Sequence, residues 1–151
     1  MSDNLSLSDL APVMEEVLSS RGEFSFIPGG DSMLPFLRNG RDTVAVVSPP
    51  ARLKKYDVPL YRRADGSFVL HRVIKVLPEG YTVRGDSQDL REHVSPSQIV
   101  AVLSSFKRGE KKRSVNNFWY RVYCVLWVNL GLLRRFILHF IRKDGSDREK
   151  K

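Results

Sequence analysis

Three side chains that could together perform nucleophilic catalysis occur at Ser32, His71 and Asp86. The serine lies in a glycine-rich stretch, Gly29–Pro35, the histidine lies in an apolar stretch, Leu70–Val73, and the aspartate directly follows a glycine. A serine hydroxyl is a weak nucleophile at neutral pH unless an oriented base removes its proton, and a carboxylate can hold an imidazole in that role. The three residue types therefore predict acyl-transfer chemistry, provided that the fold brings them together.

Each of the three residues also has an ordinary structural explanation. Ser32 follows a glycine-rich turn and could be part of a polar turn, although small neighbours such as Gly30 would also let a peptide carbonyl approach closely. Alternation along a predicted strand places His71 on one face with Val69 and Val73, and a histidine among valines is commonly a hydrogen-bonded core residue. Asp86 could be a turn aspartate. The combination of the three residues, more than any single one, favours a catalytic site.

A mainly β fold is predicted by the short β-branched and aromatic runs that follow Glu23. We expect a compact antiparallel domain over residues 23–106, preceded by a short amphipathic helix within residues 1–22. Two segments, Ala64–Ser67 and Pro78–Gly80, are typical of hairpin turns. The expected strands are Glu23–Ile27, Thr43–Val47, Val58–Arg62, Ser67–Val76, Tyr81–Arg84 and Gln98–Phe106.

Charge is distributed unevenly along the chain. Residues 1–106 contain 12 lysines and arginines against 13 acidic residues, whereas residues 107–151 contain 13 against 4. We interpret the basic part as a hinge over 107–117, an amphipathic helix over 118–142 and a charged tail over 143–151. A nucleic-acid-binding protein would place its basic stripe on the folded domain, so this distribution favours an anionic membrane surface and no nucleic acid.

Cellular context is indicated by two further features. The single cysteine, Cys124, excludes an intramolecular disulfide framework and is typical of a reducing compartment. Asp3 and Asp9 occupy the region where a secretory signal would carry positive charge, and no apolar run follows them. The sequence therefore predicts an intracellular protein.

Five short motifs follow one another in a characteristic order. A serine-methionine pair is followed two residues later by Pro35. Gly40 and Asp42, separated here by Arg41, come next, and a Gly-Asp pair comes later. In order the motifs are Ser32–Pro35, Asn39–Val44, Tyr56–Val58, His71–Val73 and Gly85–Asp86. With these motifs, Phe26–Phe106 resembles the catalytic domain of type I signal peptidases and of the related self-cleaving SOS and phage repressors.

The chain differs from most bacterial members of that family at two positions of the site. His71 stands where most bacterial members have a lysine, so the pattern resembles the endoplasmic-reticulum and archaeal type, whose site uses serine, histidine and aspartate. Histidine suits the role of base, because its ordinary pKa of about 6.5 leaves it neutral near pH 7. Gly30 stands where many members have a serine that helps to bind the oxyanion, so backbone N–H groups would have to replace it.

The resemblance implies a serine endopeptidase that cleaves an extended signal or leader peptide. Ser32 would attack the carbonyl carbon, His71 would accept the proton and Asp86 would orient the imidazole. The peptide would add a strand to the sheet. No metal and no cofactor is expected, since the histidines and Cys124 form no ligand pair at suitable spacing. The residues expected to line the substrate site are Gly30, Asp31, Ile27, Met33, Leu34 and Val69.

The segment after residue 117 is predicted to lie on a membrane rather than to cross it. Its longest uncharged run, Val122–Leu133, has 12 residues, about 18 Å as a helix, whereas the hydrocarbon layer is about 30 Å thick. We expect a peripheral position on the cytoplasmic face; a single span with snorkelling arginines and a helix packed on the protein's own sheet or on a partner are alternatives. The residues expected to contact the membrane are Trp119, Arg121, Trp127, Arg134, Arg135 and Arg142.

Two other functions remain open from the sequence. An autocleaving regulator of the same superfamily would need a DNA-binding helical unit ahead of Ser32, yet only one helix fits before Glu23. A noncatalytic, membrane-associated peptide-binding module would retain the same surface without the chemistry. The expected partners are therefore a peptide or preprotein substrate and an anionic membrane surface.

Overall fold

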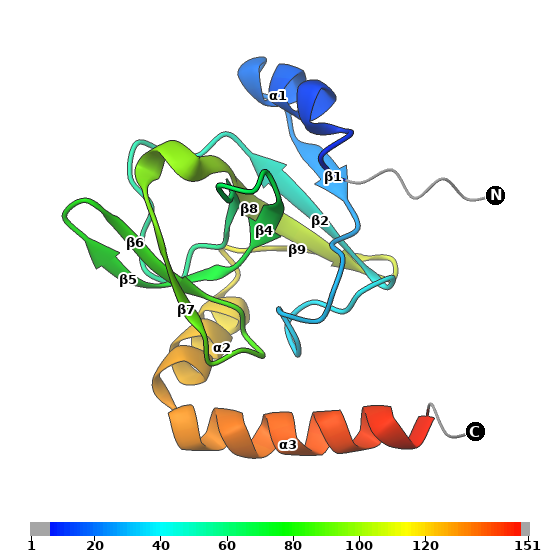
Figure 1. Cartoon of the computed structure of the whole chain (residues 1–151). Coiled ribbons are helices and arrows are strands. Elements are labelled where there is room, and N and C mark those ends of the chain that lie inside the picture. The colour runs from blue at the N-terminus through cyan, green and yellow to red at the C-terminus, as the bar shows by residue number, and fades with distance from the viewer. Residues whose placement is uncertain (1–6, 149–151) are drawn as a thin grey trace.

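Two antiparallel sheets form the body of the protein in a computed structural model, which describes the backbone of residues 7–148 and the side chains of residues 7–141. Strands make up 33% of the chain and helices 26%, which confirms the mainly β class. A helix lies at each end of the sequence, as predicted. Figure 1 shows α1 at one end of the body and α2 and α3 at the opposite end.

The strands and helices have the following bounds. The helices are α1 (Ala11–Ser19), α2 (Phe118–Asn129) and α3 (Gly131–Arg148), with a short 3-10 turn at Pro96–Gln98. The strands are β1 (Phe24–Phe26), β2 (Asp42–Val47), β3 (Pro59–Arg62), β4 (Phe68–Leu70), β5 (Arg72–Leu77), β6 (Gly80–Arg84), β7 (Arg91–Val94), β8 (Ile99–Arg108) and β9 (Lys111–Ser114).

The larger sheet is organised around the long strand β8. Its strand order is β1-β2-β8-β3-β4, and β9 pairs with the second half of β8. Both predicted hairpins are present, since β3 pairs with β4 and β5 pairs with β6, each antiparallel. The expected basic hinge over 107–117 is wrong in its first part, because β8 continues to Arg108 and a turn at Gly109 leads into β9.

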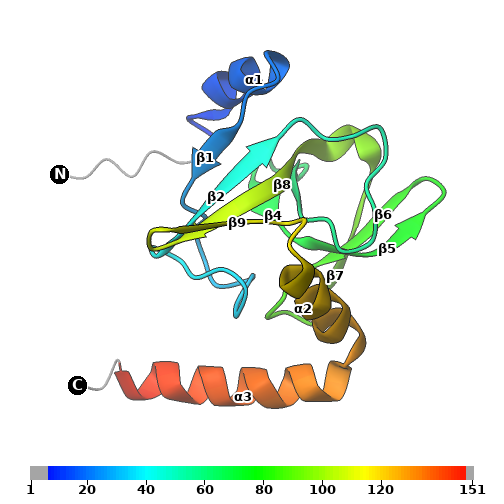
Figure 2. The same ribbon diagram turned by 180° about the vertical axis from the view of Figure 1, so that it is seen from behind.

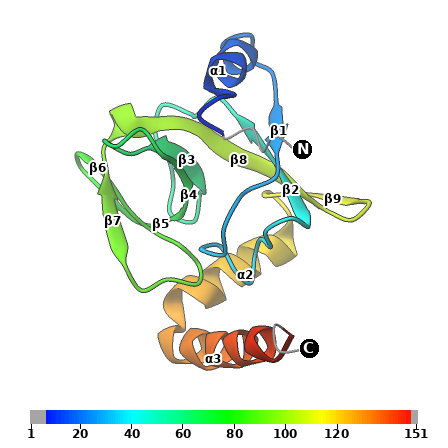
Figure 3. The same cartoon turned by 45° about the vertical axis from the view of Figure 1, so that its right-hand side comes forward.

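The smaller sheet has the order β5-β6-β7, and its first strand, β5, directly follows β4, the terminal strand of the larger sheet. The predicted strand Ser67–Val76 is interrupted at His71: Leu70 pairs with Leu60 in the larger sheet, and Arg72 pairs with Arg84 in the smaller one. Figure 3 shows β8 passing over β3 and β4 while β6 and β7 turn away to one side. The expected alternation of faces through His71 is therefore wrong, because the residue lies at the junction of two sheets.

Two clusters of buried side chains hold these elements together. One lies between α1, the larger sheet and the loop after β1, and the other joins the two sheets. In the second cluster Tyr61 and Val102 of the larger sheet meet Val73 and Val83 of the smaller one. The junction at His71 is thus supported by apolar packing on both sides.

The C-terminal segment forms two helices instead of the one expected over 118–142. Leu130 leaves helical geometry (φ −95°, ψ 70°), and Gly131 follows it. The Asn129 side chain donates to the Val125 carbonyl, in the last turn before the break. No helix within the described residues is long and apolar enough to span a membrane by itself. Together, α2 and α3 up to Ile141 would be sufficiently long and apolar, but the two helices are bent by 99° relative to each other.

A buried ion pair between Arg72 and Asp86 lies where the smaller sheet meets α2. Both side chains are almost wholly buried, and the guanidinium donates two bonds of 2.8 and 2.7 Å to the carboxylate. The remaining nitrogen of Arg72 donates to the hydroxyl of Tyr120 (2.9 Å) and to the Cys124 sulfur (3.0 Å), both on α2. The hydroxyl of Tyr123 donates to the same carboxylate at 3.1 Å. This pair therefore attaches α2 to the β domain.

We expect Arg72→Met to lower the free energy of unfolding by about 3–5 kcal/mol, because the Asp86 carboxylate would be left buried without its cation. Urea unfolding followed by circular dichroism would measure the loss. Arg62→Met is the matched control, since Arg62 is exposed and only lies over the Phe68 ring. Equal losses in the two variants would contradict the importance of the pair.

Candidate functional site

Ser32 and His71 line the same surface cavity, which has a volume of about 220 Å³. The cavity lies between the segment that follows β1 and the strand β4. Its remaining lining residues are Pro28, Gly29, Gly30, Met33, Leu37, Asn39, Arg63, Phe68, Val69, Leu70 and Gln88. The predicted nucleophile and the predicted base thus face one space from two different elements.

The loop that carries Ser32 is held by the segment Gly85–Ser87. The Ser87 N–H donates to the Ser32 carbonyl at 2.9 Å, and the Ser87 hydroxyl donates to the Asp31 carbonyl at 2.7 Å. A Cβ atom on Gly85 would lie 2.6 Å from the Ser32 carbonyl oxygen, so this close approach requires glycine. The Gly-Asp-Ser motif therefore positions the backbone of the serine loop.

His71 is buried, and one edge of its ring is held by polar side chains. Its Nδ1 atom lies 3.1 Å from the Tyr61 hydroxyl and 3.4 Å from Oε1 of Glu92 on β7. Arg63 pairs with the same Glu92 carboxylate through two nitrogens, one of them Nε at 2.9 Å. This network fixes the carboxylate beside the imidazole.

Electrostatics favour a neutral imidazole next to an ionised carboxylate. Burial lowers the pKa of His71 below its ordinary value, while the negative charge of Glu92 partly opposes the shift. The hydrogen bonds from Arg63 lower the pKa of Glu92, which therefore stays ionised near pH 7. A neutral imidazole beside that carboxylate is most stable with its proton on Nδ1, because the carboxylate only accepts. The lone pair of Nε2 is then available to the cavity.

The expected contact between Asp86 and His71 is not formed. Both oxygens of Asp86 are bonded by Arg72, and its backbone carbonyl accepts from the Trp127 indole and from Arg134. Its charge still reaches His71 through space, as a smaller influence on the pKa than burial or Glu92. We therefore correct the role of Asp86: it secures the residue after His71, and Glu92 takes the place beside the imidazole.

Ser32 and His71 are not hydrogen-bonded to each other in this structure, which describes both side chains. Catalytic hydrogen bonds are often long in ligand-free enzymes and shorten when substrate binds. Within the described residues the Ser32 N–H donates to no backbone carbonyl, so it is available to an oxyanion. The arrangement supplies a hydroxyl, an imidazole with a free nitrogen and a backbone donor around one cavity.

Three of the six predicted substrate-lining residues line the cavity: Gly30, Met33 and Val69. Gly30 adopts a positive φ of 74°, which suits glycine in a tight turn. Three others lie outside the lining. The Ile27 side chain is exposed beyond the end of β1, the Asp31 side chain is exposed, and Leu34 belongs to the turn that closes onto the Asp31 carbonyl.

The predicted membrane-contacting residues fall into three groups. Trp119, Arg121 and Arg135 are exposed, as expected. Trp127 and Arg134 are buried against the Asp86 loop, so their expected membrane contact is wrong. Both side chains instead bond the Asp86 carbonyl, because α2 and the start of α3 pack against the β domain. Arg142 lies in α3, but its side chain is outside the described residues.

Sequence reasoning missed Tyr61, Arg63 and Glu92. Glu92 lies in a run, Arg91–Val94, that is too polar to suggest a strand, yet it forms β7 and places Glu92 opposite Val83. Arg63 and Glu92 are 29 residues apart in the sequence, and neither lies in a predicted strand, so nothing signals their approach. Among the described residues no group of three or more histidine, cysteine, aspartate or glutamate side chains is placed to hold a metal ion. No family model, curated protein or solved structure matches the chain.

We expect opposite changes in the pKa of His71 when its two charged neighbours are removed. Glu92→Gln removes the charge that favours imidazolium, so the pKa should fall further below about 6.5. Arg63→Gln removes a cation and should raise it. A ¹⁵N NMR titration of the His71 ring would measure both and would identify the Nδ1–H tautomer. An unchanged pKa in Glu92→Gln would contradict the proximity of this carboxylate.

Proposed function

We propose that the protein is a serine endopeptidase related to signal peptidase I, with Ser32 as nucleophile and His71 as general base. The observation that carries this proposal is the shared cavity: Ser32 and His71 both line it, and Tyr61 and Glu92 hold Nδ1 of His71, which leaves Nε2 without a hydrogen-bond partner among the described residues. A histidine of purely structural role would have no need of a free nitrogen at a cavity that also presents a serine.

The reaction consists of two acyl-transfer steps. Ser32 Oγ attacks the peptide carbonyl carbon as its proton moves to Nε2 of His71, and the oxyanion is bound by backbone N–H groups, each worth about 3 kcal/mol. When the C–N bond breaks, His71 gives this proton to the leaving amine. Water then attacks the ester carbon and gives a proton to His71. His71 returns this proton to Ser32 Oγ as the ester C–O bond breaks, which releases the acid and restores the serine hydroxyl.

Two free strand edges support an extended peptide substrate. β1 and β4 are the terminal strands of the larger sheet, each paired on one side within the described residues. The cavity is lined by residues 28–30, which follow β1, and by residues 68–70 of β4. A peptide lying between these edges could pair with the backbone and bring a carbonyl to Ser32. The cavity of about 220 Å³ suits small side chains on the acyl side.

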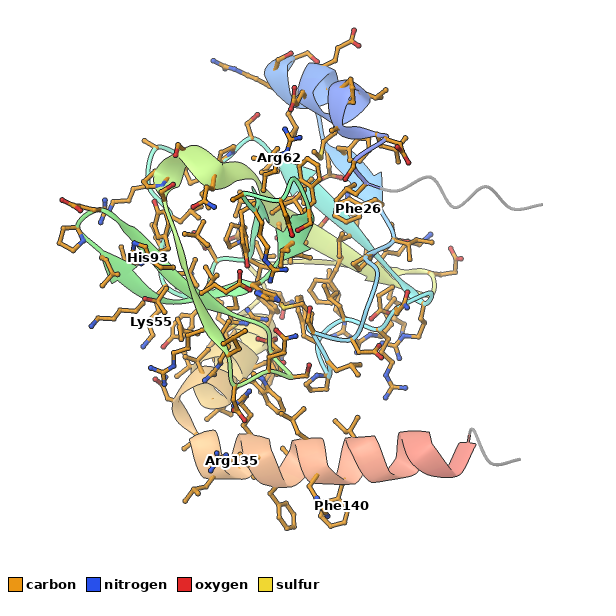
Figure 4. All side chains as sticks on the ribbon, viewed as in Figure 1. Phe26, Lys55, Arg62, His93, Arg135 and Phe140 are labelled. Carbon is orange, nitrogen blue, oxygen red and sulfur yellow. The ribbon has the colours of Figure 1, made fainter. Side chains whose placement is uncertain are left out.

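We also propose that α2 and α3 bind an anionic membrane surface. Of the twelve large hydrophobic side chains that are exposed among the described residues, nine lie between residues 118 and 140. Figure 4 shows Phe140 pointing away from the sheets, with Arg135 on the same helix. An exposed apolar surface accompanied by cations is complementary to anionic lipid headgroups. The peripheral position on the cytoplasmic side remains part of this proposal.

We expect a fluorophosphonate probe to label the protein at Ser32, since the probe reacts with activated serines. Ser32→Ala should abolish labelling and His71→Ala should slow it at least 100-fold, whereas Ser25→Ala, at an exposed serine of β1, should not change it. The rate should fall on the acid side with an apparent pKa below about 6.5, because burial lowers the pKa of the base. Labelling that survives in Ser32→Ala would refute the proposal, and peptide binding without labelling would favour the noncatalytic module.

We expect Phe136→Ser/Phe140→Ser to weaken binding to phosphatidylglycerol vesicles about tenfold, because the variant loses apolar surface that would be buried in the interface. Vesicle sedimentation would measure the partition constant. Val13→Ser, at an exposed position of α1, is the control. Binding that is equal for vesicles of phosphatidylcholine alone, or unchanged in the double variant, would contradict the membrane assignment.

A further inference from the structure

A second cavity, of about 720 Å³, lies between α2, the β8–β9 hairpin and the loop before β3. We call it the α2 cleft. It is larger than the Ser32–His71 cavity and shares no lining residue with it. Figure 2 shows, from behind, α2 following directly on β9 beside the two sheets. Its size is within the usual range for sites that bind small molecules.

The rim of the α2 cleft is positively charged. Its lining contains five cationic side chains and two acidic ones, and both carboxylates are already bonded: Glu23 to Lys112 and Ser104, and Asp57 to a backbone N–H. Within the described residues, no carboxylate pairs with Lys54, Lys55 or Arg121. Lys54 and Lys55 precede β3, while Arg121 lies on α2. These cations would favour a ligand with an acidic headgroup.

The α2 cleft is also lined by aliphatic side chains and by one unpartnered hydroxyl. Buried Val58 and Leu103 and the half-buried Val115 contribute aliphatic surface. Ser105 also lines the cleft, and its Oγ is the one buried side-chain oxygen or nitrogen without a hydrogen-bond partner in the described part of the chain. A buried polar atom without a partner costs roughly 1–3 kcal/mol, so a ligand atom that bonds it would recover that loss.

We propose that the α2 cleft binds one anionic phospholipid, with the phosphate at Lys54, Lys55 and Arg121, an ester carbonyl accepting from Ser105 and an acyl chain over Val58 and Leu103. A lipid is favoured over a compact anion because apolar surface adjoins the cations. The exposed Val125 and Leu126 of α2 continue that surface outward. The assignment does not depend on peptidase activity, since the cleft is separate from Ser32 and His71.

The cleft also adjoins the buried ion pair. Tyr120 and Cys124 line it, and both accept hydrogen bonds from Arg72. A bound acyl chain would therefore pack against side chains that hold α2 to the β domain. Lipid binding should accordingly raise the thermal stability of the protein as well as occupy the cleft.

The test is an NMR titration of the full chain with dihexanoyl phosphatidylglycerol below its micelle concentration. We expect amide shifts concentrated at 54–57, 103–105 and 120–125. The double variant Lys54→Ala/Lys55→Ala should weaken binding about 25-fold, at roughly fivefold for each lost cation. Lys75→Ala, at an exposed lysine outside the cleft, should not change it.

Ser105→Ala separates ligand contact from folding. Because the hydroxyl has no partner, its removal should leave the unfolding midpoint unchanged or slightly raised. A severalfold weaker affinity in this variant would then report a bond from the hydroxyl to the lipid. Unchanged affinity would show that no lipid oxygen bonds Ser105 and would overturn the proposed binding mode.

Three further ligands decide the class of occupant. Equal binding of dihexanoyl phosphatidylcholine would overturn the requirement for an anion. Equal binding of inorganic phosphate would overturn the role of the aliphatic residues Val58 and Leu103. Tighter binding of an acetylated hexaglutamate peptide would show that the cleft binds an acidic peptide and not a lipid. Shifts concentrated at Phe136 and Phe140 would indicate adsorption to the outer helical surface and would also overturn the assignment.

Discussion

The buried pair of Arg72 and Asp86 is the interaction on which the rest of the structure depends. Removing two charges from water is costly, and the pair is tolerated because hydrogen bonds and aromatic rings surround it. Each partner is also the immediate neighbour of a site element. His71 precedes the arginine, and Gly85 and Ser87, which flank the aspartate, contact the serine loop. One ion pair thus sets the relative positions of both candidate catalytic groups and of α2.

Local patterns in the sequence were sufficient for most of the β domain. Hairpin turns and β-branched runs located β2, β3, β6 and both hairpins, because these signals act within a few residues. Ser32 and His71, which the sequence predicted to meet, line one cavity without a hydrogen bond between them. The partner of the imidazole was not found, since Glu92 reaches it only through the pairing of β7 with β6. Which of two acidic residues meets a histidine depends on strand register and on competition for the arginines.

The C-terminal helices show where a pattern of charge and hydrophobicity misleads. The sequence interpretation assigned Trp127 and Arg134 to a membrane surface, whereas both side chains bond the Asp86 carbonyl. Apolar and cationic residues at helical spacing do not by themselves reveal which face of a helix packs on the protein. Burial of Arg134 is possible because it bonds the Gln88 carbonyl and Asp89 as well as the Asp86 carbonyl. The exposed residues of the same segment keep their apolar and cationic character.

The position of Cys124 gives the chain a built-in reporter of helix docking. It is the only cysteine in the sequence, it lies on the buried face of α2, and burial raises the pKa of its thiol. The thiolate is the reactive species, so alkylation is suppressed while the helix is seated. The rate of Cys124 alkylation under native conditions therefore reports how often α2 separates from the sheets. Local opening at the carboxyl end becomes observable without any added label.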